Sequence, residues 1–308
     1  MFIVKLVILF AACFFIYHKL YHNNTLDFEV FITLLQTNKI ITLKNVFILL
    51  LLSIINWLLE SYKWMLLVNI VTPLSYGKAI EQSLGALTSS LTTPNRVGEY
   101  GAKAIYFSKK LRKKILALNL IGNLAQLLTT VFFGTFGLFF ATQKFHLPLS
   151  NYGYMMLINS LGIALLFFCF KKSIWALSFK GYSLKKLKKF TSKVKQQALN
   201  NVLLISVLRY LCFTYQFYFL LVLFQIDVSY LDALILISSM YLIASVLPSI
   251  FIFDVLIKGS ISVWLFSYVE ANELVILAIT SLMWLLNFAI PSLIGSYFVL
   301  HFKLPDSK

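Results

Sequence analysis

Acidic residues are scarce in this chain, and so are the residues that build disulfide frameworks. Only 11 of the 308 residues are Asp or Glu, three are Cys, and charged residues of all kinds make up 12%. Soluble domains carry about 25% charged residues. Cys13, Cys169 and Cys212 lie far apart in apolar segments, without the spacing of a disulfide framework or a zinc site. The composition therefore excludes a water-soluble enzyme, a disordered chain and a disulfide-stabilised secreted module.

What the chain has is apolar length and lysine. Hydrophobic residues make up 60% of the sequence, the mean hydropathy is +0.84 and the formal net charge is +16. The basic residues fall between apolar runs, as in the cytoplasmic loops of membrane proteins. Nucleic-acid binding would need them on a water-facing surface. The pattern predicts an all-α, polytopic integral membrane protein with no nucleic-acid partner.

Two basic clusters predict the orientation. One covers residues 103–114, and the other holds nine lysines between Lys171 and Lys195, within a lysine-rich loop at 171–198. Placing both in the cytoplasm puts the N- and C-termini there as well. The lysines at 171–195 are also expected to contact anionic lipid headgroups. Because frequent Lys, Ile, Asn and Phe are typical of AT-rich bacterial genomes, we expect the inner (plasma) membrane of a bacterium.

Apolar length predicts about six full spans in a single domain covering residues 1–308. A bilayer needs about 20 apolar residues, and the segments that meet this length are 2–20, 44–70, 115–142, 150–170, 199–225 and 272–302. Residues 27–42 are mixed and are expected at the outer interface. The remaining helical segments are too short or too polar to span alone, and we read them as two broken re-entrant pairs, 78–93 with 96–110 and 230–247 with 250–268.

An internal repeat relates the two broken pairs. Residues 75–79 and 229–233 share the pattern S-Y-x-x-A, and a proline, Pro94 or Pro248, follows each tyrosine by 18 residues, so one offset of 154 aligns all four identities. The repeats cover about 44–142 and 199–302. The predicted topology inverts one copy relative to the other, as in transporters whose discontinuous helices form a site near the midplane. Chance similarity in an apolar background is the alternative.

The segment 92–103 combines a helix breaker, two glycines and three charges: Pro94, Gly98, Gly101, Arg96, Glu99 and Lys103. Proline breaks the helix, and the glycines allow close approach of a backbone or a headgroup. Arg96 can donate a forked pair of hydrogen bonds to a phosphate, and Glu99 and Lys103 can pair at i, i+4. We interpret the segment as a functional re-entrant hairpin with Pro94, Gly98, Gly101 and Pro248 as structural hinges. The alternative interpretation is an ordinary cytoplasmic loop that contains an ion pair.

A second polar set lies inside the expected 44–70 helix. Asn56, Glu60 and Lys63 follow at i, i+4 and i+7, hence on one face. A charge near the midplane costs about 2.5–3.5 kcal/mol, so Glu60 and Lys63 are expected either to form a structural pair or to line a polar cavity shared with Arg96 and Glu99. Trp64 is expected at the interface.

The second broken pair and two later spans hold further polar residues. Asp254 and Lys258 lie i, i+4 in the second pair and are expected to form the opposite gate. We expect Arg209 to snorkel to the cytoplasmic interface. Gln126 and Asn287 are read as helix–helix contacts.

Residues 94–99 carry a recognisable motif. They resemble the P-x-R-x-G-E motif of the flippase-like membrane domain family, which includes the transmembrane region of lysylphosphatidylglycerol synthase, the multiple peptide resistance factor. Lys63-Trp64 and Ser75-Tyr76 precede the motif in the matching layout. The second half departs from the family pattern, because residues 253–259 keep no Arg-Glu pair after Pro248 and have Asp254 and Lys258 instead.

The resemblance implies movement of a phospholipid or a lipid-linked headgroup between leaflets. The residues expected to bind this substrate are Arg96, Glu99, Lys103, Glu60, Lys63, Asp254 and Lys258. The resemblance does not imply lysyl transfer, because no polar segment here is long enough for the synthase's soluble domain. An integral-membrane transferase that uses Glu99 or Asp254 as a base, and a non-transporting partner of an envelope-lipid pathway, are the alternatives. The sequence predicts no resident cofactor or metal site and leaves the oligomeric state open, a homo-oligomer included.

Overall fold

The structure is a computed structural model, and every element in its described part is a helix. The described residues are 42–91, 93, 97–147, 195–246 and 251–302, with isolated positions 33 and 36; at 97 and 251–254 only the backbone is described. Among the described residues, four helices are long and apolar enough to cross a bilayer: Leu43–Val68, Arg112–Phe145, Gln196–Leu223 and Glu273–His301. This agrees with the expected all-α membrane class.

The first group of helices is α3 (Leu43–Val68), α4 (Tyr76–Ser90), α5 (Val97–Ile105) and α6 (Arg112–Phe145). The side chain of Thr42 caps α3 by accepting a hydrogen bond from the Asn45 backbone N–H at 3.3 Å. α3 and α6 are long and apolar, whereas α4 and α5 are too short to cross a bilayer alone.

The second group repeats this order of long, short, short and long helices. Its members are α9 (Gln196–Leu223), α10 (Tyr230–Val246), α11 (Phe251–Phe266), the 3₁₀ turn Ser267–Val269, α12 (Glu273–Trp284), a π-helical turn (Leu285–Ala289) and α13 (Ile290–His301). The first residues of α4 and α10 are 154 positions apart, and so are those of α5 and α11. The starts of the two short helices in each group therefore follow the same offset as the sequence repeat.

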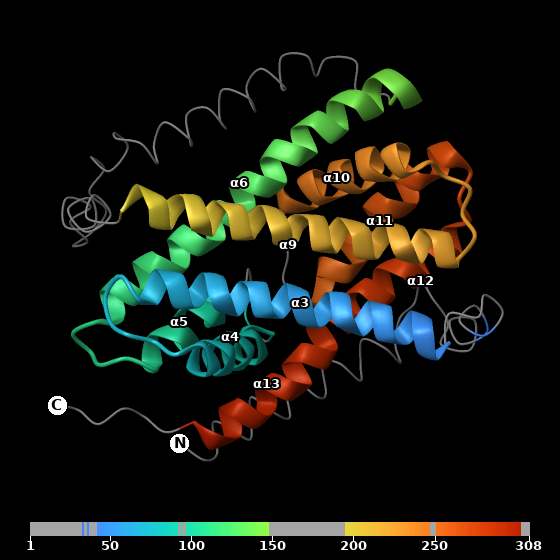
Figure 1. Cartoon of the computed structure of the whole chain (residues 1–308). Helices are drawn as coiled ribbons and strands as arrows, with labels where there is room; N and C mark the ends of the chain where they lie inside the picture. Colours follow the sequence, from blue (N-terminus) through green and yellow to red (C-terminus); the bar gives the residue numbers. More distant parts are fainter. Residues whose placement is uncertain are drawn as a thin grey trace.

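The two long helices α3 and α9 lie side by side through the middle of the molecule and run in opposite directions (Figure 1). Near the start of α3, the Leu49 carbonyl accepts a hydrogen bond from the side chain of Gln216 at 3.0 Å. Further along, the Asn56 side chain accepts one from Arg209, also at 3.0 Å. The residue numbers of the contacting partners on α9 fall as those on α3 rise, so the two helices are antiparallel.

Close helix packing joins the two groups where α6 meets α10. A Cβ added at Gly134 would lie 2.5 Å from the Cβ of Leu242, and one at Gly137 would lie 2.7 Å from the Cβ of Ser238. Real Cβ atoms do not approach this closely, so glycine lets the two backbones touch. Small residues serve the same purpose between helices in membranes, where no hydrophobic effect drives association.

α13 packs against α4 in the corresponding way. A Cβ at Gly295 would overlap the carbonyl oxygen of Leu84. The Thr88 hydroxyl donates a hydrogen bond to the Ser292 carbonyl at 2.7 Å across the same contact. The last helix of each group thus packs against the first short helix of the other group, as Figure 1 shows for α6 with α10 and for α13 with α4.

The first predicted helix break is confirmed, because α4 ends at Ser90 with Leu91 as its C-cap. Residues 247–250, where the second break is predicted, lie outside the described residues. The Gly98 N–H donates to the Thr93 hydroxyl at 2.8 Å, and a Cβ on Gly98 would lie 2.6 Å from the Ser89 carbonyl oxygen, which confirms a close backbone approach. At Gly101 no described atom outside its own helix backbone and neighbours lies within 4 Å of a Cβ built there, so no described backbone from elsewhere approaches it.

The apolar segments predicted the described helices to within a few residues, for example 44–70 against α3 and 199–225 against α9. Several predicted features lie outside the described residues. They are the spans at 2–20 and 150–170, the interfacial segment at 27–42 (apart from its isolated described positions), Pro94, Arg96, Pro248 and most of the lysine-rich loop at 171–198.

Candidate functional site

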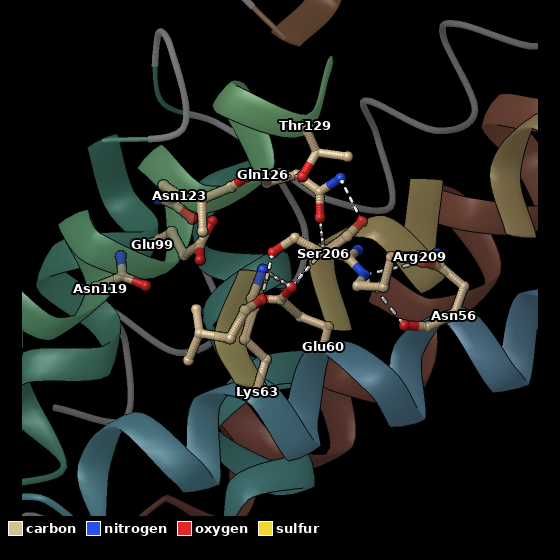
Figure 2. A network of polar contacts seen from close by, with 12 residues as sticks. Asn56, Glu60, Lys63, Glu99, Asn119, Asn123, Gln126, Thr129, Ser206 and Arg209 are labelled. Atoms are coloured by element: carbon tan, nitrogen blue, oxygen red, sulfur yellow. Dashed lines mark hydrogen bonds and ion pairs between the residues drawn. The ribbon is translucent and has the colours of Figure 1, made fainter. Parts of the chain in front are cut away.

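The polar face of α3 is buried against the neighbouring helices. Asn56, Glu60 and Lys63 are 1%, 7% and 2% exposed, and the Lys63 ammonium lies 2.7 Å from Glu60 Oε2. The predicted pairing of Glu60 with Lys63 is therefore confirmed. Their i, i+3 spacing places both side chains on the same side of the helix, and Figure 2 shows them pointing away from α3 toward α6 and α9.

Glu60 is the acceptor that three cations share. Its Oε2 atom pairs with Lys63 from its own helix and with Arg209 of α9 (Figure 2). Its Oε1 atom lies 3.8 Å from the Lys103 ammonium of α5. Charges buried this deeply are tolerated only when they are paired and hydrogen-bonded. One carboxylate thus ties together three helices, α3, α5 and α9.

Arg209 does not snorkel to an interface, so that expectation is wrong. The residue is 8% exposed, and its Nε atom donates to Asn56 Oδ1 at 3.0 Å while Nη1 donates to Glu60 and, at 3.3 Å, to Gln126 Oε1. Its guanidinium also lies 5.5 Å from the Phe213 ring centroid, in cation–π range. Arg209 stays inside the bundle because a buried carboxylate and two amide oxygens face it.

Lys103 is held from three sides. Its ammonium donates to Glu99 Oε1 at 2.8 Å and to Asn119 Oδ1 at 3.0 Å, and it lies 4.5 Å from the Trp64 ring centroid. The predicted Glu99–Lys103 pair is confirmed. The interfacial placement of Trp64 is wrong, because Trp64 is 1% exposed and donates its indole N–H to Gln82 at 2.8 Å.

A chain of amides extends the polar network toward α12. Asn56 donates to Asn287 Oδ1 at 3.2 Å, and Asn287 donates to Gln216 Oε1 at 2.8 Å. Asn287 thus connects α3 with α9, as expected of a helix–helix contact. Gln126 connects α6 with α9 by donating to the Ser206 carbonyl at 3.3 Å.

The π-helical turn beside this chain has an identifiable cause. Pro291 has no backbone N–H, so the carbonyl of Asn287 loses the partner it would have four residues on in an α-helix. The indole N–H of Trp57 donates to that carbonyl at 3.0 Å, and the Ser53 hydroxyl donates to the neighbouring carbonyl of Leu286. α3 therefore satisfies the backbone groups that the proline and the π turn release.

One cavity of about 530 Å³ joins the charged groups of both helix groups. Its charged lining consists of Glu60, Lys63, Glu99, Lys103, Arg209 and Lys258, and its aromatic lining includes Trp57, Tyr210, Phe213, Phe217, Tyr241, Trp284 and Phe288. Four cations thus face two carboxylates among the described lining residues. A cavity with apolar walls and a few convergent charges, in this size range, is typical of small-molecule sites. Its charge balance favours an anionic ligand.

The structure brings together five of the seven substrate-binding residues predicted from the sequence. Glu60, Lys63, Glu99, Lys103 and Lys258 all line the cavity. Arg96 and the side chain of Asp254 lie outside the described residues. Arg209 also lines the cavity, although the sequence placed it at the interface. The sequence signal that could have located it is an arginine inside one apolar span and a glutamate inside another, in a chain with only three arginines.

The cavity lining combines cationic side chains with aromatic rings. Glu99, the proposed base of the transferase alternative, is 5% exposed and accepts a hydrogen bond from Lys103. Within the described residues no three His, Cys, Asp or Glu side chains gather as a metal site would require. The cationic groups can hold an anion, while the aromatic wall can contact an apolar group.

Comparison with protein-family models and with curated proteins gives no match for this chain. The resemblance to the flippase-like membrane domain family therefore depends on the motif at 94–99 and on the helix layout.

Proposed function

We propose that this chain is an inner-membrane protein that moves an anionic lipid, a phospholipid or a lipid-linked headgroup, between the two leaflets. The observation that supports this most is the cavity of about 530 Å³, whose wall combines Lys63, Lys103 and Arg209 with aromatic rings. A lipid passing through the bilayer presents a charged headgroup and apolar chains together. A wall of both kinds provides partners for each part.

The location of the charges also supports transport. Glu60 lies in the interior of α3 and Arg209 in the interior of α9, and both helices are long enough to span. Charged residues inside spans are expensive, and they typically mark substrate or ion pathways. Short helices such as α4 and α5 are tolerated at membrane depth where they are buried in protein or line a cavity.

The proposed transporter design is an inverted repeat. Three observations support it: the helix order recurs at an offset of 154 residues, α3 and α9 are antiparallel, and the last long helix of each group packs against the other group. In inverted-repeat transporters the site lies between the repeats, where discontinuous helices meet. The cavity here is lined by residues of both groups, with Lys258 contributed by the second broken pair.

Leaflet exchange in proteoliposomes tests the proposal. We expect the purified protein to accelerate exchange of a fluorescent anionic phospholipid over protein-free vesicles, and Arg96→Ala and Glu99→Ala to slow it at least tenfold. Glu81→Gln is the matched control, because Glu81 forms a half-exposed i, i+3 pair with Lys78 away from the cavity. A wild-type protein that leaves exchange at the protein-free rate, at verified incorporation, would overturn the proposal.

The same preparation separates the alternatives. Formation of a modified lipid from labelled precursors by the protein alone would favour the transferase. Retained cellular function after neutralisation of Glu60, Lys103 and Arg209 together would favour a non-transporting partner of an envelope-lipid pathway. Both outcomes conflict with a cavity whose charges bind the transported headgroup.

A further inference from the structure

The Lys63–Arg209 pair has spare hydrogen-bond donors at the cavity wall. Among the described residues, Glu60 alone accepts from the Lys63 ammonium, although that group carries three N–H donors. Arg209 uses Nε and Nη1 for Asn56, Glu60 and Gln126, and no described residue accepts from its Nη2 atom. Both side chains line the cavity. Buried cations with unused donors are costly, and an acceptor-rich anion would satisfy them.

Lys103 is different, although it belongs to the same cluster. Its ammonium already donates to Glu99 at 2.8 Å and to Asn119 at 3.0 Å, and the Trp64 ring lies 4.5 Å away. These partners fix its position. Among the three cations around Glu60, the donors available to a ligand therefore lie on Lys63 and Arg209.

Glu60 Oε2 lies between these two cations and pairs with both. It occupies the place that a phosphate oxygen would take between an ammonium and a guanidinium, which is the geometry in which proteins bind phosphate tightly. We propose that Lys63 and Arg209 form a phosphate-binding site in this cavity, and that Glu60 serves as the internal counter-anion that the ligand's phosphate partly displaces. The ligand class is a phosphate monoester or diester, and the inference rests on the proposed movement of an anionic lipid.

The aromatic wall indicates how an attached lipid would be accommodated. The Phe213 ring lies 5.5 Å from the Arg209 guanidinium, and Tyr241 and Phe288 line the same cavity. Apolar rings next to the phosphate site would contact the first carbons of the ligand's glycerol or acyl part. Free phosphate makes no such contact, so a lipid phosphate should bind more tightly than inorganic phosphate.

Equilibrium binding to the full-length protein in detergent tests the site. The probes are inorganic phosphate, a short-chain phosphatidylglycerol below its critical micelle concentration, and an uncharged short-chain diacylglycerol as the negative control. We expect Lys63→Met to weaken binding of both phosphate probes at least tenfold, and Arg209→Lys to weaken it several-fold because Lys cannot present a second nitrogen. Glu60→Gln should tighten it about tenfold, since the competing carboxylate is gone.

Lys78→Met is the matched control. Lys78 and Glu81 form the same i, i+3 pair as Lys63 and Glu60, but the Lys78 side chain is 65% exposed and lies outside the cavity lining. It should leave binding unchanged. If Lys63→Met does not fold, Arg209→Lys and Glu60→Gln still decide the question, because they predict opposite signs.

Two results would overturn the assignment: unchanged affinity in folded Arg209→Lys, or weaker phosphate binding in Glu60→Gln, which would make Glu60 a structural anchor. Equal affinity for inorganic and lipid phosphate would assign the site to free phosphate and refute the aromatic contribution. Failure here and failure of the proposed function are distinguishable. A protein that binds as expected without leaflet exchange contradicts only the function, whereas exchange at wild-type rate in Lys63→Met and Arg209→Lys contradicts only this site.

Discussion

Replacing Glu60 by Gln should destabilise the protein far more than any exposed charge change. Gln is nearly isosteric with Glu, so packing is kept and only the negative charge is lost. Lys63, Lys103 and Arg209 would then remain buried beside one another without their shared counter-charge. Removing one partner of a buried ion pair typically costs about 3–5 kcal/mol. The Glu60 side chain is 10% exposed, and the adjoining cavity admits solvent, so we expect a value of about 3 kcal/mol.

Reversible unfolding in mixed detergent micelles, followed by circular dichroism, measures this difference directly. Glu81→Gln is the control, since its partner Lys78 is 65% exposed and surface pairs contribute about 0–1 kcal/mol. Adding Lys63→Met to Glu60→Gln should restore part of the loss, because one uncompensated cation is removed. A coupling energy of about 1 kcal/mol or more is expected for residues in direct contact.

The reasoning is refuted if Glu60→Gln unfolds at the same free energy as Glu81→Gln. It is also refuted if the double variant loses the full sum of the two single losses, because Glu60 and Lys63 would then act independently. Lys63 and Glu60 lie 2.7 Å apart in a site that is almost closed to solvent. Removing the charge of either residue should therefore change the free energy of unfolding.

Three further predictions test the packing and the periphery. Trp57→Phe should destabilise the protein by about 1–3 kcal/mol, because the Asn287 carbonyl loses the indole N–H that donates to it at 3.0 Å. Unfolding in micelles measures this loss, and an unchanged stability refutes the role given to this hydrogen bond. Gly295→Ala should strongly destabilise the protein, since the new Cβ would overlap a carbonyl of α4. Gly77→Ala, where no described atom outside its own helix backbone and neighbours lies within 4 Å of the new Cβ, should instead stabilise its helix by about 0.5–1 kcal/mol. Equal melting temperatures of the two variants would contradict the close contact at Gly295. The hydrogen bond from Lys144 holds the pKa of Asp232 below its ordinary value. That stabilisation is present above the unfolded-state pKa of about 3.9 and is lost as pH falls through the lower folded-state pKa. Asp232→Asn should therefore make the melting temperature less dependent on pH below about 4. An unaltered pH dependence would show that this pair does not contribute to the acid response.

The helices were predictable because the signals that define them are local. Residues 44–70 were expected as one apolar helix and α3 covers Leu43–Val68. The end of α4 at Ser90 falls just before Pro94, which was read as a helix breaker. Apolar run length and a proline's missing N–H act through neighbouring residues, so they can be read without knowledge of the tertiary fold.

The charge pairs within one helix were predictable for the same reason. Glu60 with Lys63, and Glu99 with Lys103, are separated by three and four residues, and both pairs form at 2.7 and 2.8 Å. Helical spacing alone brings such side chains together. The contact between the two pairs depends on how α5 packs against the other helices, and the residue spacing within one helix gives no information about that packing.

Arg209 and Trp64 show where local reasoning stops. Both were assigned to an interface by residue type, since long cations and indoles favour that region. Both are buried instead, Arg209 at Glu60 and Trp64 beneath Lys103. Their positions are set by partners on other helices, and a single sequence carries no direct record of which helices touch.

The exchange of helices between the two groups has a consequence for synthesis. α4 packs against α13, and α13 leaves the ribosome after all the other described helices. Until then the face of α4 that carries Thr88 lacks the Ser292 carbonyl to which its hydroxyl donates. A chain truncated before α13 would leave that face uncovered, so a late stop codon should cause loss of the whole protein. Two co-produced pieces cut between residues 171 and 194 should reassemble, because the described helices of the two groups contact one another directly.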